Sequence, residues 1–321
     1  MENITKWTDL IPDVGLKISE VYDQGDELYQ PGIFSVLKRG SSTKAQENFT
    51  GKTGFGEVKQ FADGDDIPTI ERFKTYTTKV VYKNYGGALE VTKNLIEDRD
   101  FESELDEMKD MSRSVNYSMD KSGAQMFNGG FSTTQTVNGY DMFWYNDGKA
   151  QYSTVHPTTV TGGSTQSNAS STGIALSHDN LETARLALMR QRTDNGLAMG
   201  MAGKLTLVTS LHNEKLAKEI FGSDLQPQNA NNAINVFKGA MDLVTSTFLD
   251  TVNDGLNTRW FLQNQSMAKL YQISRQEKRL ESDVNIRNKV VTYTVDARWA
   301  NCSKEWKGTW GSKGDLASFS G

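Results

Sequence analysis

The feature that most constrains this fold is a threonine- and tyrosine-rich segment followed by a long, mostly polar helix. Residues 74–85 read Lys-Thr-Tyr-Thr-Thr-Lys-Val-Val-Tyr-Lys-Asn-Tyr, and such β-branched and aromatic residues favour a strand. Residues 57–62 form a second candidate strand, and the turn-forming residues 63–68 lie between the two. Neither strand has enough apolar residues to bury both of its faces. We therefore predict an exposed hairpin arm.

An exposed hairpin normally invites unwanted pairing, because its strand edges carry free backbone donors and acceptors. A hairpin that is built to be exposed is therefore expected to contact neighbouring chains. Its apolar and aromatic side chains are the candidate assembly contacts. They are Val58, Phe61, Tyr76, Val80 and Tyr82.

The segment from about residue 98 to residue 127 predicts an amphipathic helix. Its apolar residues recur mostly every three or four positions and form one narrow stripe, which predicts a helix face. At a rise of 1.5 Å per residue, such a helix is roughly 45 Å long. A coiled coil is the alternative, but the heptad pattern is irregular and short. The stripe residues are Phe101, Leu105, Met108, Met111, Val115 and Met119.

The composition predicts a globular chain. It has 321 residues, of which 36% are hydrophobic and 23% charged, enough for two lobes. The net charge of −5 gives no basic field for holding nucleic acid. No apolar run approaches the roughly 18 residues that span a membrane, and the start of the chain lacks the pattern of a secretory signal. The single Cys302 excludes an intramolecular disulfide and fits a reducing cytoplasm.

The remaining segments predict an extended start, a compact middle and a final strand. Residues 1–48 show little periodicity and predict an extended arm. Residues 177–265 predict an α/β lobe, in which Ser177 caps a helix and short strands lie near residues 204–209, 242–245 and 259–263. Residues 290–299 alternate apolar and polar side chains, as a half-buried strand does.

Motifs for catalysis are weak in this sequence. Gly51-Lys-Thr53 lacks the earlier glycine of a phosphate-binding loop, because Gln46 stands there. The three histidines, His156, His178 and His212, lack the spacing of metal ligands. We therefore predict no catalytic, cofactor-binding or metal-binding residue and no cofactor. A pair of carboxylates for glycoside hydrolysis stays open, since such pairing is spatial.

Several short motifs follow one another in a specific order. They are Tyr152-Ser-Thr-Val-His-Pro157, Asp179-Asn-Leu-Glu-Thr-Ala-Arg185, Leu205-Thr-Leu-Val208, Asn235-Val-Phe-Lys-Gly239, Trp260-Phe-Leu262 and Tyr271-Gln-Ile-Ser-Arg275. In this order and spacing they resemble the major head subunit of Mu-like tailed bacteriophages, over about residues 141–277. That family has the Hong Kong 97-type capsid fold.

The resemblance implies an α+β chain with an N-terminal arm, an extended hairpin called the E-loop, and a long spine helix in a peripheral P-domain. It also implies an α/β A-domain inserted into the P-domain. The implied boundaries are 1–48 for the arm, 49–97 for the E-loop and its return strand, 98–176 for the spine helix and first part of the P-domain, 177–265 for the A-domain and 266–321 for the rest of the P-domain.

The resemblance further implies a major capsid protein that self-assembles through hexamers and pentamers into an icosahedral phage head around double-stranded DNA. The implied partners are a separate scaffolding protein, a portal and, as a further candidate, a decoration protein, with no sequence-specific DNA binding and no membrane. Assembly is expected in the host cytoplasm, and the product is the virion. The alternatives are an encapsulin-like shell of a cellular compartment, which would enclose a cargo protein, and a two-lobed glycan-active enzyme.

Overall fold

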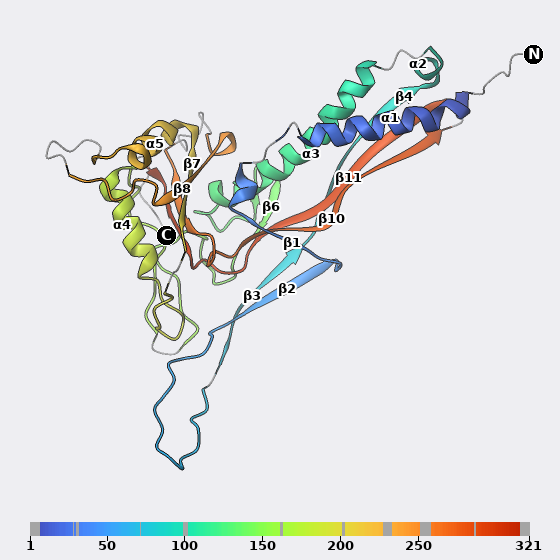
Figure 1. Cartoon of the computed structure of the whole chain (residues 1–321). Helices are drawn as coiled ribbons and strands as arrows, with labels where there is room; N and C mark the ends of the chain where they lie inside the picture. Colours follow the sequence, from blue (N-terminus) through green and yellow to red (C-terminus); the bar gives the residue numbers. More distant parts are fainter. Residues whose placement is uncertain are drawn as a thin grey trace, which may run out of the picture.

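The chain folds into an elongated body with a smaller lobe beside it and an arm that projects from their junction (Figure 1). Two long helices lie along the elongated body, and the arm points away from both other parts. The computed structural model describes residues 7–27, 29, 32–70, 72–98, 102–160, 163–200, 203–226, 233–250, 258–285 and 287–314.

A six-stranded sheet forms the elongated body. The strand order is β1-β10-β11-β6-β5, and β4 pairs with a stretch of β11 that does not pair with β6. β10 and β11 are antiparallel neighbours, and β4 pairs antiparallel with β11 from Thr92 opposite Val290 to Lys83 opposite Trp299. The strands are β1 (Lys38–Ser41), β4 (Lys83–Thr92), β5 (Thr136–Val137), β6 (Tyr140–Phe143), β10 (Leu270–Asn285) and β11 (Val290–Ser303).

The alternating strand predicted at 290–299 is confirmed as the first part of β11. The side chains predicted to share one face are buried, and those between them are half-exposed. The buried face packs against the long helix, so one side of the sheet is covered and the other is polar. The buried residues are Val291, Tyr293, Val295, Ala297 and Trp299.

The long helix is confirmed as α3 (Glu102–Asn128), which follows the short helix α2 (Lys93–Asp98). The expectation of an extended arm at 1–48 is wrong for part of that range, because α1 (Trp7–Glu27) is a helix that packs against α3. Ile18 and Tyr22 lie one turn apart on α1 and are buried in the cluster beneath it. Tertiary packing thus forms a helix where the sequence periodicity is weak.

The smaller lobe contains a four-stranded sheet with the order β12-β9-β7-β8. β7 pairs parallel with β8 and antiparallel with β9. The predicted cap is confirmed, since Ser177 Oγ accepts a hydrogen bond from Asn180 N at the start of α4. β12 comes from the end of the described chain and completes the sheet. The elements are α4 (His178–Met189), β7 (Leu205–Ser210), α5 (Glu214–Gly222), β8 (Met241–Ser246), β9 (Trp260–Asn264) and β12 (Thr309–Ser312).

The arm begins with a two-stranded ribbon, β2 (Gln46–Lys52) and β3 (Lys74–Val81). The predicted pairing is therefore corrected in two ways. Residues 57–62 form no strand, because side chains on both sides of this segment are exposed and neither side has a surface to pack on. The predicted strand at 74–85 is divided at the buried Tyr82, so that β3 pairs with β2 while β4 pairs with β11.

Candidate assembly surfaces

The arm ends in a long loop, residues 53–73, whose two ends are tied together. Thr53 N donates to the carbonyl oxygen of Phe73 at 3.0 Å, and Phe73 N donates to Thr53 Oγ1 at 3.1 Å. The described residues between them have no strand partner, and the loop stands away from the body (Figure 1). The loop is therefore held at its root.

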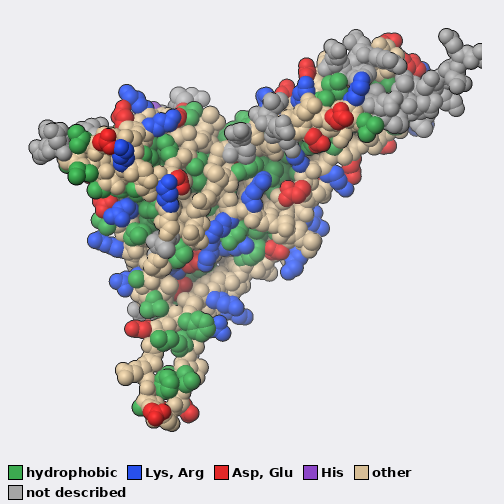
Figure 2. Space-filling view, in the orientation of Figure 1, with side chains coloured by type: hydrophobic (Ala, Val, Ile, Leu, Met, Phe, Trp, Pro, Cys, Tyr) green, Lys and Arg blue, Asp and Glu red, His purple; other side chains and the backbone are tan. Residues whose placement is uncertain are grey.

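Large apolar side chains on this loop face solvent. The exposed fraction is 61% for Phe55, 79% for Val58, 49% for Phe61, 76% for Ile67 and 51% for Phe73. Figure 2 shows apolar side chains along the arm and acidic side chains at its end. Exposed apolar side chains concentrated in this way are typical of interaction sites.

The residues predicted as assembly contacts divide between the loop and its root. Val58 and Phe61 are exposed on the loop. Tyr76 is half-buried on β3. Val80 and Tyr82 are buried within this chain, so their side chains anchor the arm and are not available to a neighbour. Val80 lies on β3 and Tyr82 directly after its end, and alternation of side chains points both toward the sheet, which the sequence did not distinguish from the exposed side.

A lysine held between two aromatic rings strengthens the root. Lys304 Nζ lies 3.7 Å from the ring centroid of Phe49 on β2 and 3.9 Å from that of Tyr271 on β10. Burial lowers the pKa of Lys304, and the nearby Lys269 lowers it further. These contacts join the ribbon to the six-stranded sheet through cation–π attraction. The apolar cluster beneath them comprises Val80, Tyr82, Ile273, Ala300 and Cys302.

The methionine-rich stripe of α3 faces its own sheet. Met108 and Met119 are buried, while Leu105, Met111 and Val115 are half-buried against the clusters on β4 and β11. The stripe is therefore a core surface of this chain. Phe101, which was predicted to begin the stripe, lies outside the described residues.

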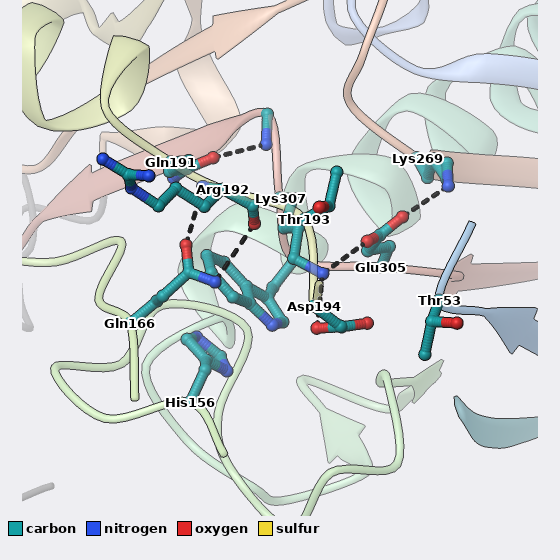
Figure 3. A network of polar contacts seen from close by, with 12 residues as sticks. Thr53, His156, Gln166, Gln191, Arg192, Thr193, Asp194, Lys269, Glu305 and Lys307 are labelled. Carbon is teal, nitrogen blue, oxygen red and sulfur yellow. Dashed lines mark hydrogen bonds and ion pairs between the residues drawn. The ribbon is translucent and has the colours of Figure 1, made fainter. Parts of the chain in front are cut away.

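A group of buried ion pairs lies beside the root of the arm (Figure 3). Lys307 Nζ is 2.9 Å from Asp194 Oδ1 and 2.9 Å from Glu305 Oε1, and Glu305 also pairs with Lys269. Burial on its own would lower the pKa of Lys307, but the two carboxylates outweigh it and raise the pKa. Burial would raise the pKa of Glu305, but Lys307 and Lys269 outweigh it and lower the pKa. The charges therefore compensate one another in a site that water hardly reaches.

The neighbouring residue connects these ion pairs to the arm. Asn195 Nδ2 donates to the carbonyl oxygens of Thr53 and Gly54, at 3.3 Å in each case. Gly196, with a φ of 81°, completes the turn by donating its N–H to the carbonyl oxygen of Thr193. The turn at 193–196 thus contacts the loop root directly, while Asp194 fixes it to the C-terminal segment.

His156 lies in the same region and is engaged on both ring nitrogens. Nδ1 lies 2.7 Å from Asp147 Oδ2, and Nε2 lies 3.0 Å from Asn168 Oδ1. The ring stacks on Trp306, with centroids 4.2 Å apart and planes 7° apart. No ring nitrogen is left for a metal or a substrate, so the geometry is structural.

Within the described residues, His, Cys, Asp and Glu side chains form no cluster of three that could hold a metal ion. Helices in the same part of the chain are too short or too polar to cross a membrane.

A second exposed apolar group lies on the lobe, next to the end of α5. The exposed fraction is 46% for Leu225, 80% for Ile234 and 68% for Val236. An open groove of about 780 Å³ runs along α5, from Leu211 to Ser223. Within the described residues, apolar side chains are therefore exposed both on the arm and at this edge of the lobe.

A family model of phage capsid proteins matches residues 74–310, which is well over half of the chain. The chain belongs to this phage capsid protein family. As a phage capsid protein it is a structural component of the virion, and its role is that of the major capsid protein that forms the head.

Solved structures place the capsid protein in the same fold as other phage capsids. A chain of Mycobacterium phage Adephagia has 13% identity and a TM-score of 0.53, with 90% of this chain and 91% of that chain covered. The bacteriophage JBD30 capsid has 14% identity and a TM-score of 0.53, with 68% and 91% covered. The capsid of Myoviridae phage XM1 has 12% identity and a TM-score of 0.51, with 87% and 89% covered. No curated protein matches the capsid protein by sequence.

These likenesses confirm the α+β class and the Hong Kong 97-type fold that the sequence motifs implied. At identities of 12–14%, these structures share the fold without sharing most of its side chains.

Proposed function

We propose that this capsid protein assembles through hexamers and pentamers into the icosahedral head of a Mu-like tailed phage and encloses double-stranded DNA. In this proposal the loop at 53–73 is the tip of the E-loop and lies across the adjacent subunit. α3 is the spine helix of the peripheral P-domain, and residues 177–265 form the A-domain around the five-fold and six-fold axes. Within residues 1–48, α1 packs along the spine helix and β1 joins the six-stranded sheet, and residues 266–321 return to the P-domain.

The observation that carries the proposal is the apolar surface of the loop. Fully burying a large apolar side chain contributes about 1.5–3 kcal/mol. Phe55, Val58 and Ile67 are more than half exposed, even though Arg72 lies over the ring of Phe55 at 4.6 Å from its centroid. In a closed symmetric shell, a neighbouring subunit can cover these side chains. Every copy then covers the loop of one neighbour and has its own loop covered by another. The exposed group at Leu225 and Ile234 on the lobe offers a second contact, near the symmetry axes.

The remaining partners follow from the same proposal. A separate scaffolding protein directs assembly in the host cytoplasm, a portal occupies one vertex, and a decoration protein is a further candidate. The net charge of −5 suits a shell that encloses DNA without holding it tightly.

The structure suggests a precise loop deletion to test this function. Thr53 and Phe73 are already paired, so residues 55–72 can be replaced by a short Gly-Ser linker without separating β2 from β3. We expect the variant to fold, with unchanged circular dichroism, and to form no closed shells when co-expressed with the scaffolding protein. Negative-stain electron microscopy and sedimentation velocity measure this outcome.

Two variants that keep the full loop length test the effect of the apolar side chains separately from the effect of loop length. Changing Phe55, Val58 and Ile67 to Ser should also abolish shells, whereas changing Gln60 and Thr69 to Ser should preserve them. Closed shells from the deletion variant would contradict the proposed role of the loop. A wild-type protein that stays monomeric with its scaffolding protein would contradict the shell itself.

A further inference from the structure

Two lysines stand directly opposite each other on the ribbon of the arm. Lys52 on β2 and Lys74 on β3 are cross-strand partners, and both are exposed. Like charges at directly opposed positions destabilise a strand pair. Within the described part of the chain, no carboxylate forms an ion pair with either lysine. Among the described residues, this repulsion in an isolated arm has no compensating carboxylate.

The same face carries a third ammonium group. Lys79 is exposed and lies opposite Asn48, which is four residues before Lys52 on β2. Between them the hydroxyl groups of Thr50 and Thr77 are 2.7 Å apart, and the strand pairing shifts register between Thr50 and Lys52. Residues of β2 alternate between exposed and half-buried, and Lys52 and Asn48 both fall on the exposed side. This face, which we name the lysine face, thus has three positive charges, and the strand pairing between them contains one irregularity.

The end of the loop has the opposite charge. Asp63, Asp65 and Asp66 are all exposed, and the described residues provide no basic partner for any of them. Asp65 N donates to the carbonyl oxygen of Ala62 at 3.1 Å, which folds this acidic tip into a turn. Figure 2 shows the acidic side chains at the far end of the arm. The loop extends away from its own ribbon, so the acidic tip does not fold back on the lysine face of the same copy (Figure 1).

We propose that the acidic tip of one copy docks on the lysine face of a second copy. This inference rests on the proposed function, because a shell places copies side by side. Three carboxylates then meet three ammonium groups, and Phe61 and Ile67 next to the tip are covered in the same contact. The charges set the register of the contact, and the apolar side chains add buried area. The repulsion between Lys52 and Lys74 is relieved upon docking, which favours the assembled arm over the free one.

Charge reversal tests the pairing with full-length protein and its scaffolding protein. The tip variant is D63K/D65K/D66K, the ribbon variant is K52E/K74E/K79E, and a third protein combines both. We expect the tip variant and the ribbon variant each to lower the yield of closed shells by about tenfold or more. The protein that combines both should recover most of the lost yield. The matched control K52R/K74R/K79R keeps the charges and should assemble as the wild type does.

A zero-length carbodiimide cross-link gives an independent readout on wild-type shells. Shells are grown from an equal mixture of ¹⁴N- and ¹⁵N-labelled protein, and linked peptides are identified by mass spectrometry. Links between residues 63–66 and Lys52, Lys74 or Lys79 should be found, and half of them should join peptides of different label. Links of uniform label would mean contact within one copy and would overturn the inference.

The two levels of failure are distinguishable. This inference is overturned, and the capsid function stays intact, if the tip variant and the ribbon variant both form shells normally and wild-type shells show no tip-to-ribbon links. A wild type that forms no shell with its scaffolding protein overturns the function and the inference with it. Loss of shells in the combined protein, with its fold confirmed by circular dichroism, also counts against the specific pairing.

Discussion

A Cβ atom built on Gly25 of α1 would lie 2.6 Å from the carbonyl oxygen of Lys109 on α3. It would also lie 2.9 Å from Cβ of Ser112. Glycine therefore lets the two helices approach more closely than any other residue would. We expect Gly25→Ala to displace α1 and to destabilise the protein by about 1–3 kcal/mol. Denaturant unfolding measures the loss, and hydrogen exchange should show faster exchange in α1.

Gly15 on the same helix is the matched control. A Cβ atom at this position would meet nothing within 4 Å. Gly15→Ala should stabilise the protein by about 0.5–1 kcal/mol, because alanine loses less backbone entropy in a helix. Equal effects at both positions would contradict the close contact between α1 and α3.

Helix α1 also shows which kind of element a local sequence pattern does not predict. Strong periodicity identified α3 and β11, because each exposes one continuous face to a single partner surface. α1 contains Pro12, Gly15 and Gly25, which are poor helix formers, so its periodic signal is weak. Its helix depends on packing against a segment about ninety residues away, which a local pattern does not contain.

The sequence predicted a hairpin arm, but it predicted the wrong partner for the strand that became β3. β2 has Phe49 as its large apolar residue, so its composition resembles a loop more than a strand. Its pairing with β3 and the contact of Lys304 on Phe49 decide its structure. The ion pair of Asp194 with Lys307 joins positions 113 residues apart, and such spatial pairing has no local sequence signature.

Cys302 is expected to be unreactive in the folded protein. Its side chain is fully buried, and burial raises the pKa of the thiol from 9.0 to about 12. This rise lowers the thiolate fraction at neutral pH, and the thiolate is the reactive form. Ellman's reagent should therefore label the native protein very slowly and the urea-unfolded protein at once. Rapid labelling under native conditions would show that the arm root opens easily.

The stack of Tyr85 on Trp299 should contribute more than the hydrogen bond made by the indole. The ring centroids are 3.8 Å apart with planes 18° apart, and Trp299 Nε1 donates to Ser122 Oγ at 3.0 Å. Trp299→Ala removes both interactions and should cost about 3–5 kcal/mol. Trp299→Phe keeps a ring for stacking and should cost about 1–2 kcal/mol. Comparable losses in the two variants, measured by denaturant unfolding, would assign the stability to the hydrogen bond instead.

Glu305 should make the stability of the folded chain sensitive to acid. Its neighbours Lys307 and Lys269 outweigh burial and hold the pKa of Glu305 below its ordinary 4.5, so the folded state favours the charged carboxylate. The resulting stabilisation is complete above pH 4.5 and is lost as the pH falls through the lower folded-state value. Glu305→Gln removes it and should cost about 1–3 kcal/mol at pH 7, because Lys307 is buried and keeps Asp194 as its remaining carboxylate. Below pH 4.5, the free energy of unfolding should fall more steeply for the wild type than for this variant.

Glu214→Gln, which breaks a surface pair with Lys218 on α5, is the control and should cost at most about 0.5 kcal/mol. Parallel pH curves for the wild type and Glu305→Gln would mean that the ion pairs beside the arm do not stabilise the folded chain.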